Sequence, residues 1–328
     1  MSDRYARVSA VLTEQPWALL PGRLEALIAA VDRHEAGRQV TVLENLVEAR
    51  MQGPTVQKSG AVAVLPLHGT IAQRMNMMTA LCGGTSSELF GQAFDQALAD
   101  PSVAAIVISI DSPGGQVAGT EELARKIFQA RGSKPIVAVA DSLAASAAYW
   151  IGAQADQFVA SPSSQVGSIG IVTAHTDVSK AEEMQGQKTT VLAVPPAKAE
   201  AHPYGPLTED AHAQAIGALQ PFYDLFVKAV ARGRGISAAD VRDGYGQGRV
   251  LAALPAKDAG MVDRIETLSE VVARLSTPQG RRAALAARVG DSRSQEIDHG
   301  PGAADAATAQ ESAQLWARVK QAEFECLT

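Results

Sequence analysis

Ser146 is the residue of this sequence best suited to nucleophilic chemistry. It stands in Asp141-Ser-Leu-Ala-Ala-Ser-Ala-Ala-Tyr-Trp150, with the small residues Ala144 and Ala148 two positions away on either side. Small neighbours allow a serine to sit on a sharp strand-to-helix turn with its hydroxyl exposed, as nucleophile elbows require. A serine at an alanine-rich helix start is more often a helix cap, so this interpretation needs support from other segments.

A serine nucleophile also needs hydrogen-bond donors for the oxyanion that forms during attack. The segment Asp111-Ser-Pro-Gly-Gly115 can supply them, because Gly114 and Gly115 let the chain turn sharply and present backbone N–H groups without a side chain in the way. The N–H of Ala147, next to the nucleophile, is the natural second donor. In isolation, Pro-Gly-Gly is an ordinary turn.

Two candidates could accept the proton of the serine. His175, with Asp177 or another acid as its orienting residue, would make a Ser-His-Asp site. Lys198 follows the apolar residues 190–194, whose burial as a strand would favour a neutral amine that can act as a base. Composition and spacing do not decide between these two bases.

The segments around these residues predict alternating strands and helices. Apolar runs predict buried strands at residues 61–68, 103–110 and 135–140, and helical stretches are expected at 120–131 and from Ser146 through Ala155. This order implies a parallel sheet with crossover helices, hence an α/β fold. The Pro-Gly-Gly and Ser146 turns then follow neighbouring strands, at the sheet edge where α/β folds place their sites.

The remaining segments suggest four regions. Helical spacing with Pro21 near the first turn predicts a helix over residues 16–34, and polar residues 52–60 indicate a linker. Further strands are expected at 157–160, 167–171 and 190–194, and helices at 207–232 and 268–275. The expected regions are a helical segment 1–51, a linker 52–60, a main domain 61–276 and an Ala/Gln-rich tail 277–328 that is mobile or folds with a partner.

A methionine-rich loop is the expected substrate-binding surface. It contains Met75, Met78, Gly83 and Gly84, and the capping-box pattern of Thr85 with Glu88 then opens a helix. Flexible methionine side chains suit an adaptable groove, although packing of the loop on the core is the simpler interpretation.

Composition excludes several classes of protein. The net charge of −6 with mixed signs gives no basic stripe for nucleic acid. The two cysteines, Cys82 and Cys326, are far apart and have no metal-ligand spacing, so neither a disulfide framework nor a metal site is expected. No apolar run reaches the length of a membrane span or a signal peptide, which predicts a cytoplasmic, unanchored chain.

The motifs in their order resemble the signal peptide peptidase A family of serine peptidases. They are Asp111-Ser-Pro-Gly-Gly115, Ala144-Ala-Ser-Ala-Ala-Tyr149, Gly167-Ser-Ile-Gly170, Lys198, His202-Pro-Tyr-Gly-Pro-Leu-Thr208 and Gly248-Arg-Val250. Gln15-Pro-Trp17 and Ala231-Arg-Gly-Arg-Gly235 make the likeness greatest to the phage head-maturation branch, the capsid-assembly protease C type. The resemblance covers roughly residues 12–275, and a string of motifs in one order is far more specific than any single motif.

The resemblance implies a Clp-protease/crotonase-like α/β fold and a Ser-Lys dyad. Ser146 would be the nucleophile and Lys198 the general base. The family usually has a glycine a few residues before its lysine, whereas Pro195-Pro196 stand here, so Lys188 and Lys180 remain alternatives.

The resemblance also assigns supporting roles and an assembly. Gly114 and Ala147, with Gly115 in the same turn, would hold the oxyanion, and Ser168 would orient the lysine. In single-domain relatives the serine and the lysine come from adjacent protomers. This chain carries one copy of each motif, which predicts a homo-oligomer with active sites shared between protomers.

The expected function is an ATP-independent serine endopeptidase that acts without a cofactor or metal. Its expected substrates are capsid, portal or scaffold proteins of a phage or prophage, in the host cytoplasm or within proheads. The alternatives are a non-catalytic scaffold protein on the same fold and a housekeeping peptidase that degrades signal peptides or membrane proteins. A crotonase-like acyl-CoA enzyme is disfavoured by the Ser-Lys pairing and by the lack of a basic patch for a nucleotide.

Overall fold

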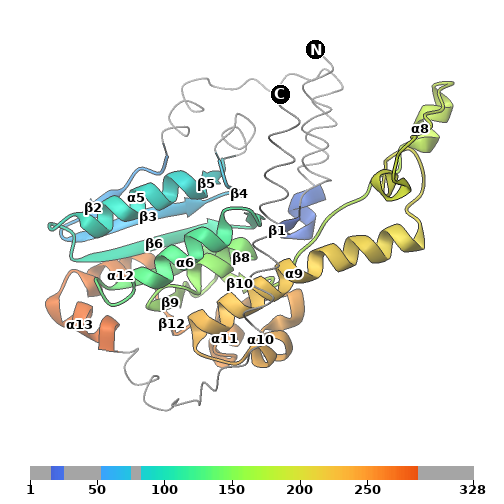
Figure 1. Cartoon of the computed structure of the whole chain (residues 1–328). Helices are drawn as coiled ribbons and strands as arrows, with labels where there is room; N and C mark the ends of the chain where they lie inside the picture. The colour runs from blue at the N-terminus through green and yellow to red at the C-terminus, as the bar shows by residue number, and fades with distance from the viewer. Residues whose placement is uncertain (1–15, 26–52, 75–82, 287–328) are drawn as a thin grey trace, which may run out of the picture. The chain divides into compact units, whose positions relative to one another are not determined.

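The computed structural model describes residues 16–25, 53–74 and 83–286 (Figure 1). Several predictions therefore lie outside the described residues. These are the helical segment apart from residues 16–25, the loop with Met75 and Met78, both cysteines, and the tail from residue 287 onward.

A large, mainly parallel sheet forms the centre of the described fold. Its strand order is β11-β10-β8-β6-β3-β2, and β9 pairs with β8 and with β12. The strands are β2 (Gln57–Ser59), β3 (Val62–His68), β6 (Ala105–Ser112), β8 (Ile136–Ala145), β9 (Gln157–Ala160), β10 (Gln165–Gly167), β11 (Val250–Ala252) and β12 (Arg264–Ile265). The pairings β3/β6, β6/β8, β8/β9 and β8/β10 are parallel. The predicted α/β fold with crossover helices is thus confirmed.

Helices cover both faces of this sheet, which explains why its central strands are almost continuously apolar. Ile106 and Ile108 of β6 pack on one face with the core that includes α5 (Ser87–Ala99) and α6 (Thr120–Ala130) (Figure 1). Val107 packs on the other face with α12 (Leu268–Leu275) and α13 (Pro278–Ala286). The alternation along β6 follows from the two-residue period of a strand.

A second, smaller sheet has the order β1-β7-β4-β5. Its strands are β1 (Trp17–Leu19), β7 (Gly114–Gln116), β4 (Ile71–Ala72) and β5 (Thr85–Ser86). The predicted Pro-Gly-Gly turn is thus the start of a strand, which pairs with β1 and β4. The second sheet begins at the carboxyl end of β6, so it borders the edge where Ser146 was expected.

The amino-terminal predictions need three corrections. Residues 17–19 are strand rather than helix because they pair with β7, and a helix starts at Pro21 as predicted. Within the predicted linker 52–60, residues 57–59 form the exposed edge strand β2, which pairs antiparallel with β3. The helix α5 is capped by Ser86, whose hydroxyl accepts from the Leu89 amide, one residue after the predicted cap Thr85.

The predicted strand at 190–194 is absent. Leu192 and Val194 are 90% and 93% exposed. In fact no residue from 170 to 210 is buried, and Figure 1 shows α8 (Ser179–Met184) apart from the sheets, connected through the amino-terminal half of α9 (Glu209–Arg234). We call residues 173–208 the arm. Among the described residues the apolar run of the arm is not packed against the core, so the pattern did not become a strand.

The carboxyl-terminal boundary also differs from the prediction of a tail from residue 277. Residues 278–286 form α13, and Ala284 is buried against the core that contains Val271 and Leu275 of α12. The packed fold therefore continues to the last described residues. The helix was not predicted because the segment has little apolar periodicity. Of its side chains only Ala284, a small one, is buried.

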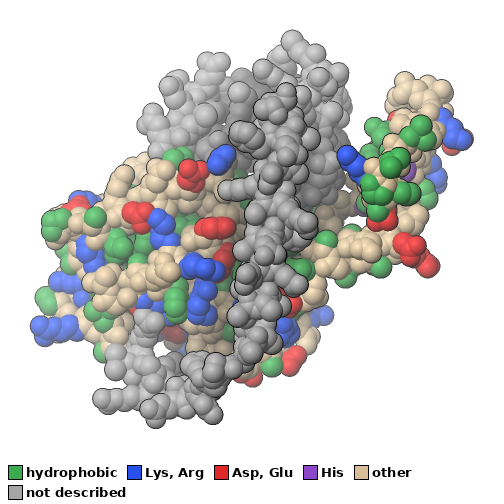
Figure 2. All heavy atoms as spheres, viewed as in Figure 1, with side chains coloured by type: hydrophobic (Ala, Val, Ile, Leu, Met, Phe, Trp, Pro, Cys, Tyr) green, Lys and Arg blue, Asp and Glu red, His purple; other side chains and the backbone are tan. Residues whose placement is uncertain are grey.

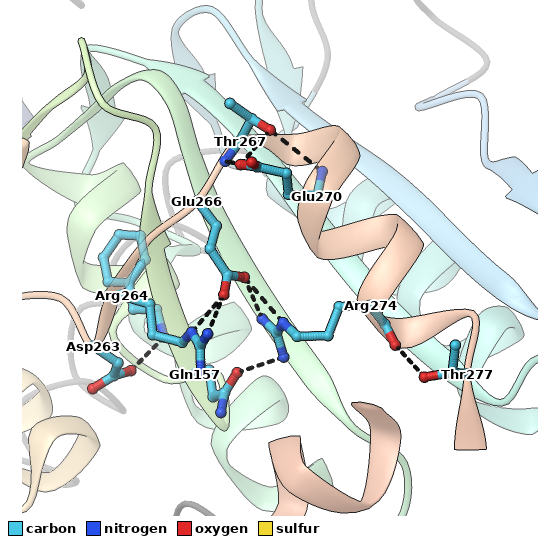
Figure 3. Close-up of polar contacts among 9 residues, drawn as sticks. Gln157, Asp263, Arg264, Glu266, Thr267, Glu270, Arg274 and Thr277 are labelled. Atoms are coloured by element: carbon cyan, nitrogen blue, oxygen red, sulfur yellow. Dashed lines mark hydrogen bonds and ion pairs between the residues drawn. The ribbon is translucent and has the colours of Figure 1, made fainter. Parts of the chain in front are cut away.

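A polar network fastens α12 to the sheet (Figure 3). Glu266 accepts from Arg264 at 2.5 Å and from Arg274 at 2.8 Å, and Arg274 also donates to Gln157 at 3.2 Å. Thr267 and Glu270 form a reciprocal capping box at the start of the helix. The network runs from Gln157 at the start of β9 to Glu266, whose amide donates to the Ala160 carbonyl at the end of β9. Its partners belong to β9, β12 and α12 rather than to the residues around Ser146, and we interpret it as stabilising rather than functional.

Candidate active site

Ser146 has the strained backbone of a nucleophile elbow. It follows β8 directly and precedes α7 (Ala147–Gly152), with φ 56° and ψ −118°. Residues other than glycine rarely adopt such backbone angles. The strain costs roughly 1–3 kcal/mol, and residues strained in this way cluster at functional sites. Ser146 is fully buried and its hydroxyl donates only a long bond of 3.5 Å to the Gly170 carbonyl.

The surrounding contacts hold this conformation. The Ser146 amide donates to the Gly167 carbonyl at 2.7 Å, and the Trp150 amide donates to the Ser146 carbonyl at 2.9 Å. The Trp150 ring stacks on Phe226 of α9 with centroids 4.4 Å apart, and its Nε1 donates to Glu121 at 3.0 Å. Helix α7 is therefore anchored to both α6 and α9, and through it the serine is anchored too.

Glu121 should contribute to stability through this anchor. It is 7% exposed and also pairs with Arg125 and Arg232, each at 3.2 Å. We expect Glu121→Ala to lower the free energy of unfolding by about 1–3 kcal/mol, because it leaves the Trp150 N–H without its acceptor. Urea denaturation measures this. The exposed neighbour Glu122 is the matched control, and an equal loss in Glu122→Ala would contradict the anchoring role.

Ser168 lies beside Ser146. The register pairs Gly167 at the end of β10 with Ala145 at the end of β8, so the two serines are the next residues of adjacent parallel strands. Adjacent strands are about 4.8 Å apart. Ser168 is also strained, with φ 55°, and its amide donates to the Arg249 carbonyl at 2.8 Å. The fold thus brings the predicted nucleophile and the predicted lysine-orienting serine together.

The glycines of β7 lie against the same point. A Cβ built on Gly114 would lie 3.0 Å from the Ser146 Cβ, so no side chain fits there. The Gly114 amide donates to the Ser112 hydroxyl at 3.2 Å, whereas Gly115 pairs with strands on both sides. Ala147 is the first residue of α7, where an N–H group has no acceptor within the helix. Of the three predicted oxyanion donors, only Gly114 donates its amide to the Ser112 hydroxyl. Gly115 and Ala147 do not share this partner.

The candidate bases lie on the arm, and none of the hydrogen bonds or ion pairs described for them reaches Ser146 or Ser168. Lys198 is exposed in the short helix η1 (Pro196–Ala199), and the alternatives Lys180 and Lys188 are exposed as well. The His175 ring contacts the Gly205 carbonyl at 3.3 Å. A single chain therefore does not bring Lys198 to Ser146.

The alternative Ser-His-Asp site is not formed in one chain either. The Ser179 hydroxyl and amide hold the pKa of Asp177 below its usual value, with the hydroxyl contributing more. The Ser179 amide donates to the Asp177 carboxylate at 2.9 Å, and the charge of His175 lowers the pKa of Asp177 further, while the Ser146 hydroxyl bonds to the Gly170 carbonyl and not to His175.

The predicted substrate groove is only partly described. Gly84 precedes β5, which is separated from β7 by β4, and the carbonyl of Gly83 would lie 2.0 Å from a Cβ on Gly69. These glycines thus allow close backbone packing two strands away from β7. Sequence reasoning did not find that Ala18 of β1 and Gly170 border Ser146, and the motif Gln15-Pro-Trp17 was the available signal for β1.

A mainly parallel α/β sheet with a strained serine at a strand-to-helix junction defines the class of this chain as an α/β fold with a nucleophile elbow. Residues 129–281 match the model of peptidase family S49. This stretch, which contains Ser146, Ser168 and Lys198, belongs to that family, as its motifs predicted.

Two relatives and one solved structure illustrate the likeness. Capsid assembly protease C of Escherichia phage lambda is 28% identical over 67% of this chain and 50% of the relative. Head-tail preconnector protein GP5 of Enterobacteria phage P21 is 23% identical over 84% of this chain and 58% of the relative. The chain thus spans between half and three fifths of these two relatives. A mutant of the 1510-N membrane-bound stomatin-specific protease is similar with a TM-score of 0.42 and 15% identity, over 66% of this chain and 84% of that chain.

No helix within residues 16–25, 53–74 and 83–286 is both long and apolar enough to cross a membrane.

Proposed function

We propose that this chain is an ATP-independent serine endopeptidase with Ser146 as its nucleophile. The observation that carries the proposal is the strained, buried Ser146 at the β8/α7 junction, beside Ser168 and the glycines of β7. Strain of this kind persists only where the surrounding structure enforces it, and it clusters at active sites. The match of residues 129–281 to peptidase family S49 supports the same reaction class.

The proposed reaction proceeds through an acyl-enzyme. The Ser146 hydroxyl attacks the carbonyl carbon of the substrate bond as Lys198 takes its proton, and the lysine then gives a proton to the leaving amine. The amides of Gly115 and Ala147 stabilise the oxyanion, and Ser168 orients the lysine. Water then hydrolyses the ester and releases Ser146. The engagement of the Gly114 amide by Ser112 favours Gly115 as the donor from β7.

The proposed substrates are proteins of a phage or prophage head, meaning capsid, portal or scaffold proteins. The names of the two phage relatives support this class, since one is a capsid assembly protease and the other a head-tail preconnector protein. The reaction would take place in the host cytoplasm or inside proheads.

We further propose that the active site is shared between protomers of a homo-oligomer. Lys198 lies on the exposed arm, while Ser146 is buried at the sheet edge. Hydrophobic side chains gather on the arm (Figure 2), where Met184, Leu192 and Val194 are 89%, 90% and 93% exposed. Apolar side chains of this kind are typical of a surface that another chain covers. When the arm of one protomer covers a neighbouring protomer, Lys198 of the arm would reach the Ser146 site of that neighbour.

Mixing two inactive variants tests the shared site. Ser146→Ala and Lys198→Ala should each be inactive alone, and an equal mixture, unfolded and refolded together, should recover about a quarter of the wild-type activity, since a site is whole only when both neighbours supply an intact residue. Cleavage of fluorescein-labelled casein measures the recovery. Zero recovery in mixed oligomers would contradict sharing. Lys188→Ala and Lys180→Ala are the matched controls, and loss of activity in one of them with an active Lys198→Ala would move the base there.

A further inference from the structure

Strand β1 is hydrogen-bonded along both of its edges. On one edge, the amides of Trp17 and Val172 each donate to the carbonyl of the other at 2.9 Å. On the other edge, the Leu20 amide donates to Pro113 at 3.1 Å and the Val117 amide to Pro16 at 3.5 Å. The segment thus fills a strand position between β7 and Val172, which we call the β1 position.

The register places a peptide bond of β1 at the nucleophile. Ala18 is paired with Gly115. Because hydrogen-bonded pairs alternate along antiparallel strands, the bonds at Pro113 and Val117 make Ala18 and Gly115 the bonded pair between them. The Gly115 amide therefore faces the Ala18 carbonyl. Gly115 is also the donor that the proposed mechanism assigns to the oxyanion.

The same carbonyl lies close to Ser146. A Cβ built on Gly114 would be 2.2 Å from the Ala18 oxygen and 3.0 Å from the Ser146 Cβ, so both atoms border one point. Ala18 and Ser146 are fully buried. An extended peptide with its cleavable bond at Ser146 and its carbonyl toward Gly115 would have to occupy the place of β1.

We propose that the β1 position is where this chain binds its protein substrate, as an extended strand with a small side chain at the place of Ala18, and that β1 itself competes for that position. The proposal rests on the proposed peptidase function for its consequence but not for its binding site. The edge of β7 and the bridge at Val172 supply backbone hydrogen bonds that any sequence can use, so specificity comes from side-chain size at the place of Ala18. Activity then requires β1 to leave.

Binding without catalysis is the first test. In the full chain carrying Ser146→Ala, a fluorescein-labelled peptide with the sequence of residues 14–20 should bind at least about tenfold more tightly after Ala18→Glu, since a buried glutamate expels β1 and frees the position. Fluorescence anisotropy measures the affinity. Gly22→Glu is the matched control, because it adds the same charge on an exposed residue with open space around it. Equal affinity in the Ala18→Glu and Gly22→Glu chains would overturn the proposal.

A reversible lock is the second test and does not depend on the folding of Ala18→Glu. The lock is a disulfide between Trp17→Cys and Val172→Cys, and Cys82→Ser and Cys326→Ser remove the native thiols. Residues 17 and 172 are a hydrogen-bonded antiparallel pair. The Cα atoms of such a pair are about 5.5 Å apart, which is within disulfide range. Oxidation should slow casein cleavage at least about tenfold and reduction should restore it. Equal rates of casein cleavage in the oxidised and reduced chains would show that β1 stays in place during catalysis, and would contradict the proposal.

The two tests separate this proposal from the peptidase function. Peptide binding that depends on Ala18→Glu supports the β1 position, and if chains with Ser146 intact, with and without Ala18→Glu, never cleave casein, the peptidase function is contradicted while the β1 position stands. Casein cleavage that neither Ala18→Glu nor the lock changes supports the peptidase and contradicts the β1 position. If the chain cleaves itself or the peptide of residues 14–20, a product that begins at Leu19 would support the placement of the Ala18–Leu19 bond at Ser146.

Discussion

Replacement of Ser146 by alanine is expected to lower the rate of casein cleavage by a factor on the order of 10⁴ or more, because the acyl-enzyme cannot form. Stability should change little. Alanine keeps the Cβ, so the strain at φ 56° is unaltered, and the hydroxyl gives up only the 3.5 Å bond to Gly170. Active-site labelling with a fluorophosphonate, located by mass spectrometry, should also disappear.

The exposed Ser133 in the turn after α6 provides the matched control. Ser133→Ala should retain both labelling and cleavage. If Ser146→Ala still cleaves casein at the wild-type rate with unchanged assembly, the nucleophile lies elsewhere. If the wild type is never labelled at Ser146 and cleaves nothing, a non-catalytic role on this fold becomes the better interpretation.

The central sheet and the Ser146 junction could be predicted from the sequence because their signals are local. The runs that became β3, β6 and β8 are apolar on both faces, since helices cover both sides of the sheet. The alanines around Ser146 reported the tight packing of the β8/α7 junction, where Ala145 and Ala147 are fully buried. The order of these elements then fixed the sheet edge that carries the site.

The rest depended on contacts between distant segments. Strand β1 has three residues between Pro16 and Pro21, too short for any periodicity, and it exists because β7 and Val172 hydrogen-bond it. The apolar pattern of residues 190–194 predicts a strand, yet no described strand of residues 16–25, 53–74 and 83–286 pairs with them. Pro-Gly-Gly read as a turn for the same reason, since only the neighbours of Gly115 make it a strand. Pairing partners of short segments are not encoded within the segments.

Gly114→Ala is expected to lower kcat/KM for casein by roughly 10²–10³, about the effect of removing one oxyanion donor. The new Cβ would lie 2.2 Å from the Ala18 oxygen and 3.0 Å from the Ala145 oxygen, at a φ of 102° that alanine rarely adopts. Backbone atoms cannot rotate away as a flexible side chain can, so β7 must shift and carry the Gly115 amide with it.

Gly132→Ala is the control that separates the two effects of Gly114→Ala, the steric clash of the new Cβ and the strain of a positive φ. Gly132 also has a positive φ, of 82°, but a Cβ built on it has nothing within 4 Å. It should cost about 1 kcal/mol of stability and no activity. The double variant Gly114→Ala with Ala18→Glu decides between two causes. Ala18→Glu alone should raise casein cleavage, because it frees the β1 position for substrate. If the new Cβ at Gly114 only displaced β1, the double variant would be as active as Ala18→Glu alone. Since a substrate carbonyl must occupy the place of the Ala18 carbonyl, the same Cβ excludes substrate, and the double variant should stay as slow as Gly114→Ala.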